Sequence, residues 1–304
     1  MSSKEIDVVR LDADKYLSEY TISWTNFNAR QEFRAVDESG LTVVASNDVK
    51  SIWFRKVILG AYDFVGMDIN QQFARREIEA LLNNMYACLE DRLWINHPKQ
   101  NRFAENKLHQ LQLAAKLGFM TPETLVTSNP DEAESFILNL KPKRVVYKTL
   151  SRPLISDVGD EVRSVFTSEI SEITTPMRSA IRVAPCLFQE YIEKDYELRI
   201  TVVGNQVFAA RIYSQEHEET KLDWRRDQHK VTLRHEVENL DPQLERMCIN
   251  LTRSLGLTFG AIDMIVTPRQ ERVFLEINPN GQWGWIEKLT GLPIADALID
   301  VLTG

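Results

Sequence analysis

The chain has 304 residues, of which 43% are hydrophobic and 26% are charged, with 12 glycines and 11 prolines. This balance is that of an ordinary globular protein and excludes a low-complexity or collagen-like chain, while the length predicts two or three domains. The formal net charge of −8 disfavours a dedicated nucleic-acid-binding protein, so we expect no nucleic-acid partner.

The cysteine spacing and the length of the apolar runs indicate where in the cell the protein is expected. Cys88, Cys186 and Cys248 lie far apart and form no C-x-x-C pair, which predicts neither a disulfide framework nor a zinc site. No apolar run approaches the roughly 18 residues that a membrane span requires. We therefore expect a cytoplasmic protein with no membrane partner.

Residues 1–96 are predicted to form an N-terminal domain. Residues 21–27 and 41–45 alternate as strands do, and a turn signal at 38–40 precedes the second. Apolar residues recur at helical spacing from Gln71 to Leu93, which predicts one long helix. The polar run 96–101 then breaks the pattern, so we place a domain boundary there.

Residues 97–185 are predicted to form a central subdomain. A helix is expected over 104–117, because Gly118 provides a C-terminal cap signal. A second helix is expected to open at Asn129, where Pro130 and acidic residues follow a favourable N-cap. A strand over 143–149 and a polar loop over 151–160 complete this part.

Residues 186–304 are predicted to form a C-terminal subdomain rich in strands. We expect strands at 187–192, 196–203, 207–213, 260–266 and 273–278, helices at 243–255 and 292–302, and a charged loop at 214–230. This order predicts an α/β or α+β fold.

A candidate metal site lies on the last two predicted strands. Glu276 and Asn278 are two residues apart and so project from the same face of a strand, while Asp263 interrupts an apolar run in the preceding strand. Two carboxylates and an amide oxygen suit Mg²⁺. The alternative is an acidic sheet face that is simply solvated.

A candidate anion site lies on the preceding hairpin. Glu197 and Arg199 share one face, and a three-residue loop would pair Val203 with Val207 and Arg199 with Arg211. That register leaves an unbroken apolar face, and for this reason we expect it. Two opposed arginines would favour a bound phosphate, and the alternative is that each pairs with a surface acid.

Two lysines extend this set. Lys148 ends the apolar run of its strand, where a lysine is rare unless it meets a charge, whereas Lys107 on a helix is ordinarily solvated. No Walker loop, G-x-G-x-x-G, H-E-x-x-H or G-x-S-x-G motif is present. P-loop, Rossmann, zinc-protease and serine-hydrolase functions are therefore excluded.

These residues together resemble the ATP-grasp ligases, and within them the graspetide synthetases, which macrocyclise microviridin-type ribosomal peptides. The resemblance runs from about Leu11 to the C-terminus. Its motifs are Ser51-Ile-Trp-Phe-Arg-Lys, Gln189-Glu-Tyr-Ile, Tyr196-Glu-Leu-Arg-Ile-Thr-Val-Val-Gly, Asp223-Trp-Arg and Leu275-Glu-Ile-Asn-Pro-Asn-Gly-Gln-Trp-Gly-Trp-Ile-Glu. It implies an ATP-grasp fold with a pre-ATP-grasp-like N-terminal domain, a central domain and a C-terminal ATP-grasp domain.

The resemblance also implies roles for single residues. It assigns Lys107 and Lys148 to the phosphates of ATP, Gln189, Glu190, Tyr191 and Ile192 to a hinge whose backbone reads adenine, and Glu197 to the ribose. It assigns Arg199 and Arg211 to the γ-phosphate and the acyl phosphate made from it, and Asp263, Glu276 and Asn278 to Mg²⁺. Trp224 and Arg225 are candidates for contact with the peptide; the alternative is a mobile surface loop.

The implied activity is an ATP-dependent macrocyclisation. An Asp or Glu side chain of a ribosomal precursor peptide would become an acyl phosphate, which a Thr or Ser hydroxyl or a Lys amine would attack. The resemblance also implies a homodimer. Since family members usually begin with a further strand and helix, we expect either a shortened N-terminal domain or a truncated start. Residues 51–56 and the helix from Ala104 are candidates for contact with the leader.

Two other functions stay open. One is a glutathione-synthetase-like carboxylate–amine ligase that acts on a small molecule or a protein terminus, and it would share every ATP-binding residue. The Trp283-Gly-Trp285 and 51–55 segments favour the macrocyclase. The other is a non-catalytic peptide-binding module, whose expected mark would be a lost metal ligand or phosphate lysine.

Overall fold

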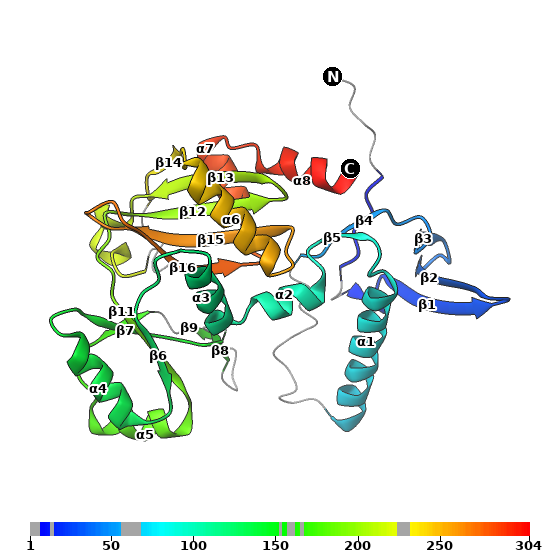
Figure 1. Cartoon of the computed structure of the whole chain (residues 1–304). Helices are drawn as coiled ribbons and strands as arrows, with labels where there is room; N and C mark the ends of the chain where they lie inside the picture. The colour runs from blue at the N-terminus through cyan, green and yellow to red at the C-terminus, as the bar shows by residue number, and fades with distance from the viewer. Residues whose placement is uncertain are drawn as a thin grey trace. The chain divides into compact units, whose positions relative to one another are not determined.

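The computed structural model describes residues 7–12, 15–55, 68–151, 154–156, 162–164, 167–223 and 232–304. The chain divides into two compact units, one comprising residues 1–98 with 302–304 and the other comprising residues 99–301. Figure 1 labels their helices and strands. The mixed α/β class predicted from the sequence is confirmed.

The first unit contains a small antiparallel sheet in the order β1-β2-β3. Its strands are β1 (Tyr20–Phe27), β2 (Arg30–Asp37) and β3 (Thr42–Ala45). Helix α1 (Ile69–Cys88) buries Leu82 in the core that this sheet supplies. Two short strands, β4 (Ser51–Trp53) and β5 (Leu93–Ile95), pair in parallel beside them.

The long helix ends earlier than the sequence predicts. It begins with a capping box between Asp68 and Gln71, and it ends at Cys88. Leu93, which we expected in the last turn of the helix, belongs instead to β5. The indole Nε1 of Trp94 donates to the carbonyl of Leu89 at 2.8 Å. The apolar residues past residue 88 keep the spacing of a helix by coincidence. The chain at Leu93 is extended because it pairs with β4.

One half of the second unit is a four-stranded antiparallel sheet in the order β10-β7-β11-β6. Helices α4 and α5 share its hydrophobic core. The elements are β6 (Thr124–Thr127), α4 (Pro130–Leu140), β7 (Val145–Lys148), β10 (Ser168–Ile170), α5 (Thr175–Val183) and β11 (Cys186–Glu190), with a separate hairpin of β8 (Leu154–Ser156) and β9 (Val162–Ser164).

The other half is a five-stranded antiparallel sheet in the order β14-β13-β12-β15-β16. Helix α6 (Pro242–Ser254) crosses it (Figure 1). The strands are β12 (Tyr196–Val203), β13 (Gln206–Ile212), β14 (His235–Glu238), β15 (Phe259–Val266) and β16 (Arg272–Asn278). The other elements are α2 (Pro98–Ala104), α3 (Lys107–Lys116), the 3-10 turns η2 (Ser214–Glu216) and η3 (Glu218–Thr220), α7 (Gly284–Thr290) and α8 (Ile294–Thr303).

The main core lies between this sheet and α6. Leu198, Ile200 and Val202 on β12 pack with Cys248 and Leu251 of the helix. All eight residues of β12 are buried, so this strand is covered on both faces. In the part of the chain that the structure describes, no helix is long and apolar enough to cross a membrane.

Candidate active site

Three polar side chains lie in one row across the five-stranded sheet. Arg199 on β12 pairs in register with Asp263 on β15, and Asp263 pairs with Glu276 on β16. Nη1 of Arg199 donates to both carboxylate oxygens of Asp263, at 2.7 and 2.8 Å. These side chains are only 7% and 14% exposed, and either charge would be costly to bury alone. The face opposite α6 therefore carries a fixed cation at one end of the row, beside two acidic groups.

The predicted register of the β12–β13 hairpin is wrong. Gly204 and Asn205 form a two-residue turn, so Val203 pairs with Gln206. Gly204 has a φ of +58°, a conformation that glycine adopts without steric cost. Because β12 is buried on both faces, the hydrophobic pattern could not distinguish one register from the other.

This register moves Arg211 away from Arg199. Arg211 pairs with Leu198 and therefore lies on the α6 face of the sheet. Its guanidinium forms an ion pair with Glu238 and lies 4.8 Å from the ring centroid of Tyr196. The hydrogen bond with Glu238 raises the pKa of Arg211. The geometric argument for Arg211 at the γ-phosphate is thereby lost.

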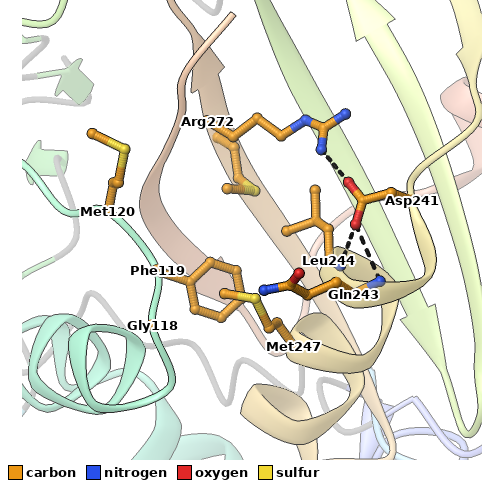
Figure 2. Close-up of a pocket in the computed structure, with 9 residues that line it drawn as sticks. Gly118, Phe119, Met120, Asp241, Gln243, Leu244, Met247 and Arg272 are labelled. Carbon is orange, nitrogen blue, oxygen red and sulfur yellow. Dashed lines mark hydrogen bonds and ion pairs between the residues drawn. The ribbon is translucent and has the colours of Figure 1, made fainter.

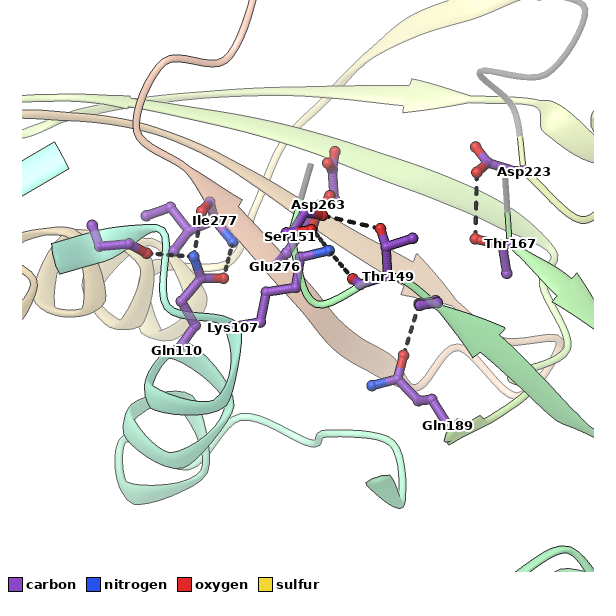
Figure 3. Close-up of polar contacts among 12 residues, drawn as sticks. Lys107, Gln110, Thr149, Ser151, Thr167, Gln189, Asp223, Asp263, Glu276 and Ile277 are labelled. Carbon is purple, nitrogen blue, oxygen red and sulfur yellow. Dashed lines mark hydrogen bonds and ion pairs between the residues drawn. The ribbon is translucent and has the colours of Figure 1, made fainter. Parts of the chain in front are cut away.

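Lys107, the first residue of α3, reaches the acidic row. Its Nζ donates to the carbonyl of Thr149 at 2.9 Å and lies 3.8 Å from Oε2 of Glu276 (Figure 3). Thr149 directly follows β7 of the four-stranded sheet. One lysine thus joins a helix and both sheets, so it is more than the solvated surface residue that its sequence position suggests.

Gln110 holds α3 in place, and the sequence analysis did not identify it. The side chain is 3% exposed. Its Nε2 donates to the carbonyls of Ala104 and Ile277, and its Oε1 accepts from the backbone N–H of Ile277 at 3.0 Å. A buried amide with these partners fixes the start of α3, and hence Lys107, against β16 (Figure 3). A glutamine on a helix gives no local signal of this role.

Lys148 lies at the end of β7 and contacts the neighbouring strand. Its Nζ donates to Oε1 of Gln189 at 2.7 Å. The Nε2 of Gln189 donates to Oγ1 of Thr124 at 2.9 Å, and Gln189 is 3% exposed. The side chain of Gln189 therefore positions the lysine.

The segment after β11 is anchored through its backbone. The N–H of Glu190 donates to the carbonyl of Glu123, and the N–H of Tyr191 donates to the carbonyl of Arg144, both at 2.8 Å. The guanidinium of Arg144 lies 4.1 Å from the ring centroid of Tyr191. An ion pair of 2.8 Å joins Lys143 to Glu190, and the hydrogen bond to this carboxylate raises the pKa of Lys143. The predicted hinge is thus fixed at the end of β11, between the strands β6 and β7.

Glu197 is held by a buried lysine. Its Oε1 accepts from Nζ of Lys194 at 2.8 Å and from Oγ of Ser214 at 2.9 Å. The side chains of Lys194 and Glu197 are 4% and 8% exposed. Glu197 lies on the same face of β12 as Arg199, two residues away.

A tight turn follows β16 and lies directly on the sheet. A Cβ atom at Gly281 would lie 2.3 Å from Cβ of Ala261 and 3.0 Å from Nη2 of Arg199. The same Nη2 donates to the carbonyl of Gln282 at 3.3 Å. Only glycine permits this approach, which gives Arg199 a second anchor.

The proposed metal ligands agree in chemistry with Mg²⁺. Asp263 and Glu276 are adjacent across two strands, and Oδ1 of Asn278 accepts from the N–H of Asn280 at 2.9 Å. Among the described residues, no three His, Cys, Asp or Glu side chains form a metal cage. Two carboxylates and an amide fit a cation that takes its remaining ligands from phosphate and water.

The predicted peptide contacts Trp224 and Arg225 lie outside the described residues. The preceding Asp223 is described and is 6% exposed. Oγ1 of Thr167 lies 3.4 Å from its Oδ2 (Figure 3). Asp223 thus lies beside the start of β10, in the four-stranded sheet.

A cavity of about 200 Å³ lies away from these residues, on the α6 face of the five-stranded sheet. Figure 2 shows Phe119, Met247 and the ion pair of Asp241 with Arg272 along its wall. It contains none of the predicted site residues.

Two family profiles together match almost the whole chain. The RimK-like ATP-grasp domain matches residues 104–302, and the MvdD pre-ATP grasp domain matches residues 1–102. Among curated proteins, a probable alpha-L-glutamate ligase of an Enterobacter species and a ribosomal protein bS6–L-glutamate ligase of Salmonella newport are each 28% identical over 200 residues. These alignments cover 64% of this chain and 62% of each relative, so the chain spans less than two thirds of their length.

Two solved structures match over nearly the full length. A RiPP-associated ATP-grasp ligase of Chryseobacterium gregarium, in complex with ADP and a leader and core peptide, is 31% identical with a TM-score of 0.86, covering 98% of this chain and 88% of that one. The macrocyclase MdnC of Microcystis aeruginosa, bound with the precursor peptide MdnA, is 29% identical with a TM-score of 0.81, covering 97% and 90%.

Proposed function

Because this chain belongs to the RimK-like ATP-grasp ligases and carries an MvdD-type pre-ATP-grasp domain, we propose that it is an ATP-dependent macrocyclase of a ribosomally made precursor peptide. It joins a side-chain carboxyl group of the peptide to a Thr or Ser hydroxyl as an ester, or to a Lys amine as an amide.

The observation that carries this proposal is the extent of the similarity. The ligase of Chryseobacterium gregarium aligns with 98% of this chain at 31% identity. The glutamate ligases align with 64% of it. The alignment with the glutamate ligases thus leaves out about a third of this chain, and residues 1–102 match the MvdD domain.

The proposed nucleotide site uses residues from both sheets of the second unit. We propose that Lys107 and Lys148 bind the phosphates, that the backbone from Gln189 to Ile192 reads adenine, and that Glu197 accepts from the ribose. Lys148 already donates to Gln189 and Lys107 lies beside Glu276. The ammonium group of each lysine is therefore already positioned by a polar neighbour. We propose that a phosphate group of ATP binds there.

The first chemical step joins two anions. A carboxylate oxygen of the peptide attacks the γ-phosphorus of ATP, and the bond from that phosphorus to the β–γ bridging oxygen breaks to release ADP. Arg199 neutralises the charge that develops, since its guanidinium is buried and fixed by Asp263 and Gln282. Mg²⁺, when bound by Asp263, Glu276 and Asn278, would supply further charge neutralisation at the phosphates.

The second step closes the ring. The hydroxyl or amine of the same peptide attacks the acyl carbon, its proton leaves, and phosphate departs with the oxygen that came from the carboxylate. Both reacting groups belong to one bound peptide, and such positioning can be worth about 7–11 kcal/mol of the barrier. A water-excluding site is needed because an acyl phosphate also reacts with water.

The competing proposal is a ligase that adds an amino acid to a small molecule or a protein terminus. The similarity to curated glutamate ligases, 28% identity over 200 residues, supports this alternative. It would use the same ATP residues and differ in the acceptor. A non-catalytic module is disfavoured because Asp263, Glu276 and both lysines are present.

The remaining proposals follow from the main one. We propose subdomain limits at 97–185 and 186–304. The peptide partner has a leader and a core that contains Thr, Ser or Lys and Asp or Glu. The protein acts in the cytoplasm as a homodimer. Trp224 and Arg225 stay predicted contacts of the peptide.

The test is mass spectrometry of a candidate precursor. A short reading frame beside the gene, encoding Thr or Ser near clustered Asp or Glu, supplies the peptide. After incubation with ATP and Mg²⁺ it should lose one water mass per ring, and Asp263→Ala should abolish the loss. An unchanged peptide, together with transfer of glutamate to a protein terminus, would support the competing ligase.

A further inference from the structure

Lys194 is buried in an unusual setting. It follows the predicted adenine hinge by two residues, and its side chain is 4% exposed. Lysine is almost never buried this far unless it is paired. Its Nζ donates to Oε1 of Glu197 at 2.8 Å and to the backbone carbonyl of Leu222 at 3.1 Å. One ammonium group therefore joins the start of β12 to a segment that follows β13.

Glu197 uses one of its two oxygens for this junction. Both of its hydrogen bonds, from Lys194 and from Ser214, fall on Oε1. Within the described residues, Oε2 accepts no hydrogen bond and is not among the buried polar atoms that lack a partner. A carboxylate held through one oxygen can accept a ribose hydroxyl through the other.

The segment from Ser214 to Asp223 is folded on itself and reaches the other sheet. Oγ1 of Thr220 donates to the carbonyl of Ser214 at 2.8 Å, and both residues are fully buried. At the far end, Asp223 lies 3.4 Å from Oγ1 of Thr167, just before β10. The segment thus spans from the five-stranded sheet, where Lys194 and Ser214 hold it, to the four-stranded sheet.

We infer that Lys194 is a positioning residue that couples occupancy of the nucleotide site, through Glu197, to the ordering of the segment Ser214–Asp223. The inference rests on the proposed contact of Glu197 with the ribose. When a ribose hydroxyl donates to Oε2, the carboxylate is fixed from both sides. Lys194 and Ser214 then lose motional freedom, and so does the backbone at Leu222. ATP binding and ordering of the segment Ser214–Asp223 would be linked through this path, and such a linkage acts equally in both directions.

The experiment is amide hydrogen exchange on the full chain, with Mg·ADP as the probe. In the wild-type protein, Mg·ADP should slow exchange both at the hinge Gln189–Ile192 and in Ser214–Asp223, the latter by about five-fold or more, the lower end of ordinary coupling between sites. In Lys194→Met the hinge should still be slowed, whereas the segment should exchange at the same rate with and without Mg·ADP.

The chain offers a matched control and a milder variant. Lys221 lies in the same segment, but its ion pair with Glu218 is on the surface, with side chains 42% and 82% exposed. Lys221→Met should keep the full Mg·ADP effect. If Lys194→Met does not fold, Ser214→Ala removes the other donor to Oε1 at almost constant volume, and it should weaken the Mg·ADP effect in the segment.

The outcomes separate this inference from the proposed function. In Lys194→Met the segment could exchange faster while Mg·ADP still slows its exchange by the same factor as in the wild-type protein. That result would show that the lysine only stabilises the fold, and it would overturn this inference but not the proposed function. The same unchanged ratio in Ser214→Ala would also count against it. Absence of protection at the hinge in the wild-type protein would overturn the proposed nucleotide site, and this inference with it.

Discussion

Two arginines on neighbouring strands offer a direct test of the site. Arg199 and Arg211 were both predicted to bind the transferred phosphate, but the observed register puts them on opposite faces of the sheet. We predict that Arg199→Met lowers the rate of peptide modification by about 10²–10³-fold, the usual cost of removing one donor that stabilises a transition-state charge. Arg211→Met should lower it by less than about 10-fold.

The burial of each pair sets the expected loss of stability. In Arg199→Met the carboxylate of Asp263, which is 14% exposed, loses its partner, and breaking such a buried pair costs about 3–5 kcal/mol. The side chain of Arg211 is 35% exposed and that of its partner Glu238 is 7% exposed. Its removal should cost about 1.5–3 kcal/mol, the range for a hydrogen bond to a charged group.

Activity must therefore be compared per folded molecule. Urea unfolding gives the folded fraction of each variant, and mass spectrometry of the precursor gives the rate. Arg199→Lys keeps a cation beside Asp263 and should fold better than Arg199→Met, yet it should stay at least about 10-fold slow because the planar fork is lost. Equal losses of rate in the Arg199→Met and Arg211→Met variants, after this correction, would refute the geometric argument.

Further predictions concern a phosphate lysine, a turn and a histidine. Lys148→Met should raise the KM for ATP by about 10-fold or more, as expected when a charge-assisted contact with phosphate is lost; an unchanged KM would remove this lysine from the nucleotide site. Gly281→Ala should destabilise the protein by about 1–3 kcal/mol and slow modification, because the new Cβ would lie 2.3 Å from Cβ of Ala261. Gly284→Ala, with nothing within 4 Å of the new atom, is the control for helix α7, and equal effects of the two changes would contradict the prediction. Burial lowers the pKa of His235 below its ordinary value of 6.5, so the unfolded chain binds more protons in mild acid, and the free energy of unfolding should fall as the pH drops below about 6.5. His235→Phe should remove that part of the decline, which urea unfolding at about pH 7.5 and about pH 5.5 would reveal as a smaller difference than in the wild-type protein.

Local signals were sufficient to predict many elements. Asn129 accepts from the N–H of Asp131 at 3.0 Å and opens α4 as expected, because an N-cap acts within one turn. Strand β12 has the predicted bounds. The polar run 96–101 was interpreted as a break, although Pro98 within it begins helix α2. Proline fits the first turn of a helix as well as a loop, so its presence alone could not distinguish them.

The part of the site that follows from the alternation of polar and apolar residues in a strand was predictable. Asp263 and Glu276 meet as neighbours, because each interrupts or alternates with apolar residues in consecutive strands. The position of Arg211 was not predictable, since a strand covered on both faces gives no register signal. Gln110 and Lys194 were missed for another reason. Their partners, at Ile277 and Leu222, are distant in sequence, and only tertiary packing brings them into contact.

The central claim is that a peptide carboxylate is activated as an acyl phosphate. A precursor peptide whose Asp and Glu side chains carry a heavy isotope of oxygen tests it most directly. If the claim holds, each ring formed releases one inorganic phosphate that contains one heavy oxygen, because the attacking carboxylate oxygen leaves with the phosphorus. Ring formation with unlabelled phosphate, or consumption of ATP with the label retained in the peptide, would contradict it.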